Sequence, residues 1–194
     1  MLSTFPVSRV VRAAVVAVAG VAAVAAGAAP AQAQSYTGTV TGENGVNVRS
    51  APSIHSESTT GLEKGETVVL ECKMRGTSVG DNEVWYAIHG GTEWVTARFV
   101  ENVGTAPKWC PQGDTETATA TATSDLNVRE GPTTADQLVS SVPAGESVEV
   151  RCSARSQDIG GDRTWYATMT GQWVTGAYVE LDGGVAECNL ADAP

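Results

Sequence analysis

Apolar and polar residues alternate in short runs through most of the chain. Val46 and Val48 share one face of an extended segment, while Asn47 and Arg49 share the other, which is the two-residue period of a half-buried strand. β-Branched and aromatic residues of similar character, separated by Gly or Pro, recur at 36–41, 67–72, 84–88 and 94–95. No segment after residue 33 keeps a helical period beyond one turn. The pattern therefore predicts an all-β protein.

The second half of the chain repeats the first at an offset of 80 positions, which falls to 78 near the end. Val46-Asn47-Val48-Arg49 returns as Leu126-Asn127-Val128-Arg129. The other matching pairs are Gly65-Glu66 with Gly145-Glu146, Cys72 with Cys152, Trp85-Tyr86-Ala87 with Trp165-Tyr166-Ala167, Trp94-Val95-Thr96 with Trp173-Val174-Thr175, and Cys110 with Cys188. The repeat predicts two tandem copies of one small domain.

The boundary between the copies depends on a Thr-Ala alternation at 117–123. Alone, this run resembles a low-complexity linker. It stands opposite 36–41 in the repeat, however, and alternating Thr suits a strand, so we interpret it as the opening strand of the second copy. The predicted organisation is a first domain at 34–103, a linker at 104–115 that contains the closing Cys110, and a second domain at 116–194.

The first 33 residues have the pattern of a cleaved signal peptide. Arg9 and Arg12 precede an Ala, Val and Gly stretch at 13–29, and small residues follow up to Ala33. The alternative is a membrane anchor, but a spanning helix needs about 20 strongly apolar residues. We therefore expect cleavage after Ala33, no membrane attachment afterwards, and a secreted protein that is extracellular or associated with the cell wall.

Four cysteines are expected to form disulfides in that oxidising location. Each copy holds one cysteine in its middle and one at its end, which favours the pairs Cys72–Cys110 and Cys152–Cys188. Each bond closes a loop of nearly forty residues, worth about 4 kcal/mol on the chain-entropy model. A structural zinc site is the alternative, but zinc ligands normally come in close pairs and these cysteines do not.

The charge and the histidines limit the function. Removing residues 1–33, which hold two basic and no acidic residues, leaves 161 residues with a net charge of −12, the wrong sign for nucleic acid. His55 and His89 do not recur in the second copy, and no free thiolate is expected beside them. The acidic turn at 158–162 offers too few oxygens for calcium. We expect a non-enzyme without a metal or cofactor.

The tryptophans are the candidate ligand-binding residues. Trp85 and Tyr86 are adjacent, so on a strand they point to opposite faces. In the first copy Val84, Tyr86 and Ile88 form an apolar face, which places Trp85 outward, although the second copy shows the opposite apolar set. An exposed aromatic surface suits sugars or extended peptides. The predicted ligand-binding residues are Trp85, Trp94, Trp165 and Trp173; the alternative is that these indoles pack the core.

The order of these motifs resembles the bacterial SH3-like domain. Asn-Val-Arg and a Pro turn come first, then a Gly-Glu turn, Trp-Tyr, Trp-Val and a closing aromatic-Val, over 36–102 and 116–181. The family turn usually reads Gly-Pro, as at Gly131-Pro132, whereas the first copy has Ala51-Pro52. The resemblance implies a small, partly open barrel and an exported, non-catalytic module that recognises peptidoglycan or its peptides.

The functional prediction is a secreted, non-catalytic tandem module that binds cell-wall peptidoglycan or a cell-wall peptide. The alternative is an extracellular interaction scaffold, or an inhibitor of another exported protein. Arg49 and Arg129 are expected to bridge strands or loops. The ligand, the exposed aromatic face and the relative orientation of the copies do not follow from the sequence.

Overall fold

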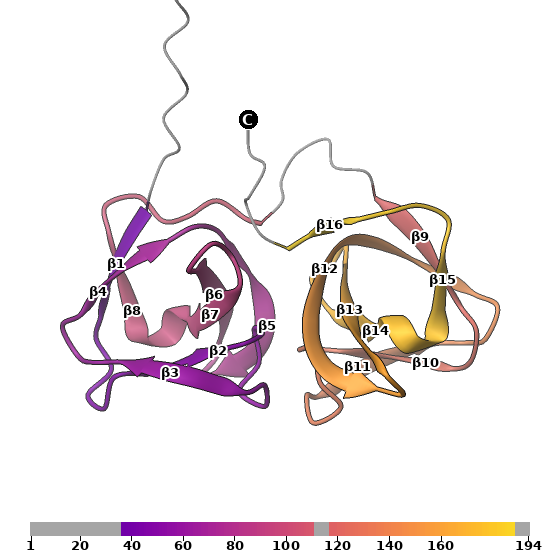
Figure 1. The fold of residues 1–194 in the computed structure, drawn as a ribbon, viewed down its shortest axis with the longest axis horizontal. Helices are drawn as coiled ribbons and strands as arrows, with labels where there is room; N and C mark the ends of the chain where they lie inside the picture. The colour runs from indigo at the N-terminus through magenta and orange to yellow at the C-terminus, as the bar shows by residue number, and fades with distance from the viewer. Residues whose placement is uncertain (1–35, 111–116, 189–194) are drawn as a thin grey trace, which may run out of the picture. The chain divides into compact units, whose positions relative to one another are not determined.

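A computed structural model describes residues 36–110 and 117–188. The predicted signal peptide and residues 111–115 of the predicted linker lie outside this part of the chain. The described residues are almost entirely strands and turns, and each half curls its strands around a small core (Figure 1). None of the helical segments within these residues is long and apolar enough to cross a membrane. The predicted all-β class is confirmed.

The first half forms two curled sheets, with strand orders β4-β1-β8 and β3-β2-β7-β6-β5. All the named strand pairs in this half are antiparallel. Its elements are β1 (Tyr36–Val40), β2 (Val46–Arg49), β3 (Ser58–Leu62), β4 (Thr67–Leu70), β5 (Lys73–Val79), β6 (Asn82–Ile88), β7 (Glu93–Thr96), the 3-10 turn η1 (Ala97–Phe99) and β8 (Val100–Val103).

The second half repeats this order in one sheet, β11-β10-β14-β13-β12-β9-β15, with β16 added beside β12. The long β12 takes the place of both β4 and β5. The elements are β9 (Ala118–Ala122), β10 (Leu126–Arg129), β11 (Leu138–Val142), β12 (Ser147–Ile159), β13 (Asp162–Thr168), β14 (Trp173–Thr175), the 3-10 turn η2 (Gly176–Tyr178), β15 (Val179–Leu181) and β16 (Ala186–Glu187).

The Thr-Ala run is a strand, as expected from its place in the repeat. Its three alanines, at 118, 120 and 122, are buried, and the threonines between them, at 119 and 121, are half-buried. In contrast, the sequence pattern missed β3 and its counterpart β11. Their residues are almost all exposed, so no buried face produces an alternation. These strands form because β2 and β10 offer unpaired backbone groups, which must find partners.

Each half has its own small core inside the curl. In the first half, Val48, Leu70, Ile88 and Val95 pack together with less than 1% of their surface exposed. In the second half, Ala120, Leu126, Val150 and Val174 form the equivalent cluster. The apolar residues of the alternating segments fill these cores, which is the burial that their two-residue period predicts.

A third cluster joins the two halves, and we call it the interface cluster. It contains buried residues from the first half (Cys72, Met74, Trp85, Ala87, Trp94, Cys110) and from the second half (Cys152, Trp165, Ala167, Trp173, Cys188). The two halves accordingly belong to one compact unit. The two halves therefore share apolar packing in addition to their separate cores.

Both predicted disulfides are present. Cys72 bonds Cys110 and Cys152 bonds Cys188, with a Cα–Cα distance of 5.0 Å in each. Two residues apart on β12, Val150 belongs to the second core and Cys152 to the interface cluster, although the two-residue period of a regular strand would place both on one face. A shift in the β12–β13 register between these residues adds Arg151 as an extra residue. A bulge of this kind moves the following side chain to the opposite face.

Candidate functional site

The four candidate tryptophans do not form an exposed surface. Trp85, Trp94, Trp165 and Trp173 are each at most 2% exposed. The prediction of an exposed aromatic platform at these positions is therefore wrong, and the alternative of buried indoles holds.

The reason for this burial is tertiary. Tyr86 and Ile88 do point into the first core, so Trp85 does point away from it, as the first copy's pattern predicts. The second half has the same arrangement, with Tyr166 packed against its own core and Trp165 on the other face. The face that leaves each core meets the other half of the chain instead of water.

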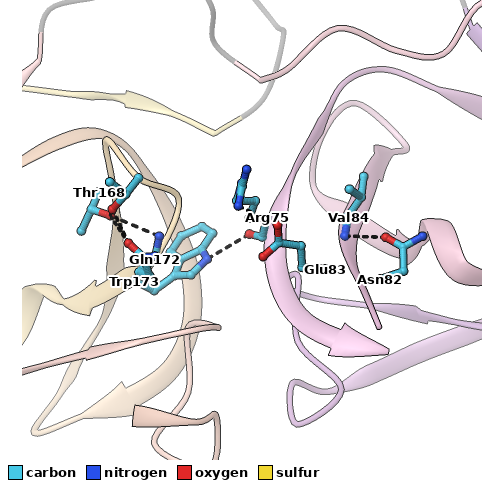
Figure 2. A network of polar contacts seen from close by, with 8 residues as sticks. Arg75, Asn82, Glu83, Val84, Thr168, Gln172 and Trp173 are labelled. Atoms are coloured by element: carbon cyan, nitrogen blue, oxygen red, sulfur yellow. Dashed lines mark hydrogen bonds and ion pairs between the residues drawn. The ribbon is translucent and has the colours of Figure 1, made fainter. Parts of the chain in front are cut away.

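Hydrogen bonds hold the indoles in place. Trp173 Nε1 donates to the carbonyl oxygen of Arg75 in the other half at 3.2 Å (Figure 2). Trp85 Nε1 donates to the Thr77 carbonyl and Trp165 Nε1 to the Gln157 carbonyl, both at 2.9 Å. Buried indole N–H groups need such partners. These contacts fix the orientation of three of the four buried indoles.

A buried carboxylate also links the halves. Asp136 is 2% exposed and accepts hydrogen bonds from Ser53 Oγ at 2.8 Å and from Thr77 Oγ1, both in the first half. Within its own half it accepts from the backbone N–H and the Oγ1 of Thr133, each at 2.9 Å. Four donors thus replace the water that a carboxylate loses on burial.

A groove lies within the first half, and we call it the first-half groove. Its volume is about 470 Å³, within the range of ligand sites. Its walls come from the β1–β2 turn, β2, the ends of β5 and β7, β6, and η1. The lining residues are Gly42, Glu43, Asn44, Gly45, Val46, Asn47, Arg49, Ile54, Val79, Trp85, Thr96 and Phe99.

The groove combines apolar and polar walls. Ile54 is 41% exposed, and the half-buried Phe99 has the Arg98 guanidinium 5.7 Å from its ring centre. Asn47 is exposed on β2 and adds amide groups beside them. An apolar surface with a few polar groups suits a peptide or a sugar. The apolar surface supplies contact area, and the polar groups fix the orientation of the ligand through hydrogen bonds.

Arg49 contributes to both structure and the groove. Its Nη1 donates to the Ser56 carbonyl at 2.6 Å, which fixes the loop after β2, and burial lowers the pKa of its guanidinium. Arg129 donates in the same way to the Asp136 carbonyl at 2.8 Å. Both arginines therefore bridge a strand to a loop, as expected. Arg49 in addition lines the first-half groove.

Sequence reasoning missed Ile54 and Phe99 as groove residues. Ile54 lies in a polar loop without periodicity, and Phe99 lies in a 3-10 turn that follows a strand. A weak signal existed for Ile54, since a lone large apolar residue in a polar loop lacks the periodicity of a core position. The groove itself joins residues of the segment 42–54 to residues of the segment 79–99, which local patterns do not bring together.

The cysteines and histidines, which were the candidates for catalysis or metal binding, make structural contacts. All four cysteines are in disulfides, so none is a thiolate nucleophile. His89 Nδ1 contacts the Glu93 carboxylate at the surface, and the His55 backbone N–H donates to Ser53 Oγ at 3.0 Å. Within 36–110 and 117–188, no three metal-ligating side chains gather into a site.

The family model of the bacterial SH3 domain matches residues 44–101. Residues 44–101 are a bacterial SH3 domain. The matched segment runs from the β1–β2 turn into β8, and it contains every lining residue of the first-half groove except Gly42 and Glu43. The resemblance found in the sequence is thereby confirmed for the first half.

Two solved structures are similar to the chain. The endolysin LysPBC5 CBD has 11% identity, covers 76% of this chain and 93% of its own, and has a TM-score of 0.28. NlpC2 from Trichomonas vaginalis has 13% identity, covers 77% of this chain and 49% of its own, and has a TM-score of 0.24. No curated protein matches the chain.

Proposed function

We propose that the chain is a secreted, non-catalytic binding protein that recognises cell-wall peptidoglycan or its peptides through the first-half groove. The observation that carries this proposal is the coincidence of the groove with the bacterial SH3 domain at 44–101. The signal-like pattern at 1–33 supports export.

The second half belongs to the same proposal. Its strands repeat the order of the first half, and its Arg129 makes the same strand-to-loop bond as Arg49. We infer that 116–194 is a second copy of the bacterial SH3 domain. At the position of Phe99 it carries Tyr178, whose side chain is 44% exposed and could contact a ligand.

The test is co-sedimentation of the oxidised protein with purified sacculi freed of protein and teichoic acid. An Ile54→Ser, Asn47→Ala double variant removes apolar contact and an amide from the groove, and both side chains are exposed enough to leave the core intact. A Val69→Ser variant is the matched control, because Val69 is 57% exposed on β4 and does not line the groove.

We expect the wild type and the control to pellet, and the groove variant to bind roughly fivefold or more weakly, as loss of a central contact costs at least about 1 kcal/mol. Equal pelleting of the wild type, the groove variant and the control would show that the first-half groove is not the binding site. If none pellets at moderate salt, peptidoglycan is excluded, and the alternative of an exported protein partner is tested by affinity capture from the secreted proteins.

A further inference from the structure

A second hollow lies between the halves and is lined by cations in an otherwise acidic protein. Its volume is about 540 Å³, and Arg75, Trp109 and Arg151 line it together with the turn at 169–172. Lys73 lies beside it, with its Nζ 5.2 Å from the centre of the Trp109 ring, and the Arg75 guanidinium is 5.9 Å from that centre. We call this hollow the basic groove.

A carboxylate of the described residues partly balances only one of the two arginines that line the basic groove. Arg75 pairs with Glu83 at 2.6 Å, and both side chains are about half exposed. Arg151 is the extra residue of the β12 bulge, and its Nε is buried without a hydrogen-bond partner within 36–110 and 117–188. Burial, and next the positive charge of Arg75, lower the pKa of Arg151. An unpaired buried donor beside another cation is costly unless an acceptor arrives.

The internal repeat supplies a natural comparison. An equivalent but smaller groove, of about 120 Å³, lies between the halves, and part of its lining, including Gly91, Arg155 and Glu187, consists of counterpart residues. Glu187 pairs with β12 where Trp109 bridges β5, so the two positions correspond in structure as in sequence. Trp109 stands in place of Glu187, which lines the smaller groove. Arg151 stands at the sequence position of Glu71, so both differences make the basic groove more positive than its counterpart.

We propose that the basic groove binds an oxyanion, a carboxylate or a phosphate, with Arg151 as its main donor and Trp109 as an apolar wall for the attached group. A guanidinium can offer two parallel N–H donors to such an anion. The cation-π contacts of Lys73 and Arg75 with Trp109 hold two further positive charges beside it. Gly171 fits this wall because a Cβ there would lie 2.7 Å from Arg75 Cδ.

The site needs both halves of the chain, since β5 and Trp109 come from the first and Arg151 from the second. It shares no lining residue with the first-half groove. Binding of small anions and binding to sacculi can therefore succeed or fail independently.

The test is an NMR titration of the oxidised protein with sodium acetate and, separately, sodium phosphate at constant ionic strength near 0.15 M, where distant charges are screened beyond about 8 Å. The signals followed are the Trp109 indole N–H and the Arg151 Nε–H. The variant is Arg151→Glu, which installs the residue that the first half carries at this position. Arg155→Glu is the control, because it changes the net charge equally but lies in the equivalent groove.

We expect saturable shifts in the wild type and in Arg155→Glu, and about tenfold weaker binding in Arg151→Glu, as expected for one charge-assisted hydrogen bond. Saturation by acetate or by phosphate identifies the preferred oxyanion. Shifts that grow without saturation in both titrations would overturn the proposal. Equal affinity in a folded Arg151→Glu variant would do the same.

Discussion

At the scale of single residues, the two copies use equivalent positions for different tasks. Ser56 donates to the Ala51 and Ser53 carbonyls at 2.9 Å and so stays within its own half. Its counterpart Asp136 reaches across to Ser53 and Thr77. Gly131 leaves room for this carboxylate, because a Cβ there would lie 2.5 Å from Asp136 Oδ2. This explains why the two copies differ as Ala51-Pro52 and Gly131-Pro132.

Asp136→Asn should lower the free energy of unfolding by about 2 to 4 kcal/mol. The new amide would bring a donor into a buried site that already holds four donors. Urea denaturation followed by circular dichroism measures the change. Asp158→Asn is the control, since Asp158 is exposed and accepts only a turn N–H, and a change within about 0.5 kcal/mol is expected there. Equal effects of the two variants would contradict the role of Asp136.

The ionisation of Glu93 should make the free energy of unfolding depend on pH in the acidic range. Hydrogen bonds, first from His89 and then from Thr59, lower the pKa of its carboxyl group. A lowered folded-state pKa means that the stabilisation is present above the ordinary carboxyl pKa of about 4.3 and is lost as the pH falls through the folded value. NMR titration of the Glu93 side chain should give a pKa below the ordinary value, and His89→Ala should raise it. An unchanged pKa in His89→Ala would exclude His89 as the cause.

At the scale of elements, the bulge in β12 has two consequences. It turns Cys152 out of the second core and into the interface cluster, and it places Arg151 in the basic groove. The first half achieves the same turn by a break between β4 and β5, so Leu70 and Cys72 also lie in different clusters. Each disulfide then ties the end of its half to this turned segment.

Removal of the second disulfide by Cys152→Ala and Cys188→Ala should destabilise the protein by about 4 kcal/mol, because the loop it closes spans 36 residues. Guanidinium denaturation of the oxidised proteins gives the difference. The hydrogen bond from the Cys188 N–H to the Ser153 carbonyl at 2.8 Å holds the end of β16 in place, so exchange of the backbone N–H at position 188 should be faster in the variant than in the wild type. Unchanged exchange and stability would show that pairing of β16 does not need the disulfide.

At the scale of the whole molecule, the shared interface cluster makes the two halves dependent on each other. Trp94 of the first half lines the smaller groove between the halves together with Ser153 and Arg155 of the second half. Trp173 of the second half donates a hydrogen bond to the Arg75 carbonyl of the first half. The same face of each copy is thus buried by its neighbour. Separation of the halves would expose this tryptophan-rich surface to water, at a cost of about 25 cal/mol for each Å² of apolar surface.

The two halves should consequently unfold in one transition. Tryptophan fluorescence and far-UV circular dichroism should give coincident denaturation curves, because the indoles report on the interface and the strands on both cores. Trp173→Ala should lower the free energy of unfolding by about 3 to 5 kcal/mol. Tyr178→Ala is the control, since that side chain is 44% exposed. Two resolved transitions in the wild type would contradict the coupling.

The amino-acid sequence by itself determined the strands with a buried face, the internal repeat and the pairing of the cysteines. Val46 and Val48, for example, show their burial in a local period, and the repeat assigns Cys110 to Cys72 and Cys188 to Cys152. Local patterns could not reveal β3, which has no buried face, or the first-half groove, which joins distant segments.

Only the tertiary structure decided whether the four predicted tryptophans are exposed to water or buried. The sequence correctly places Trp85 on the face opposite the first core, but the same pattern describes a side chain facing water and one facing another half. The bulge at Arg151 is equally invisible, because one extra residue in a ladder depends on the partner strand. Periodicity defines which residues share a face, whereas long-range packing determines what covers that face.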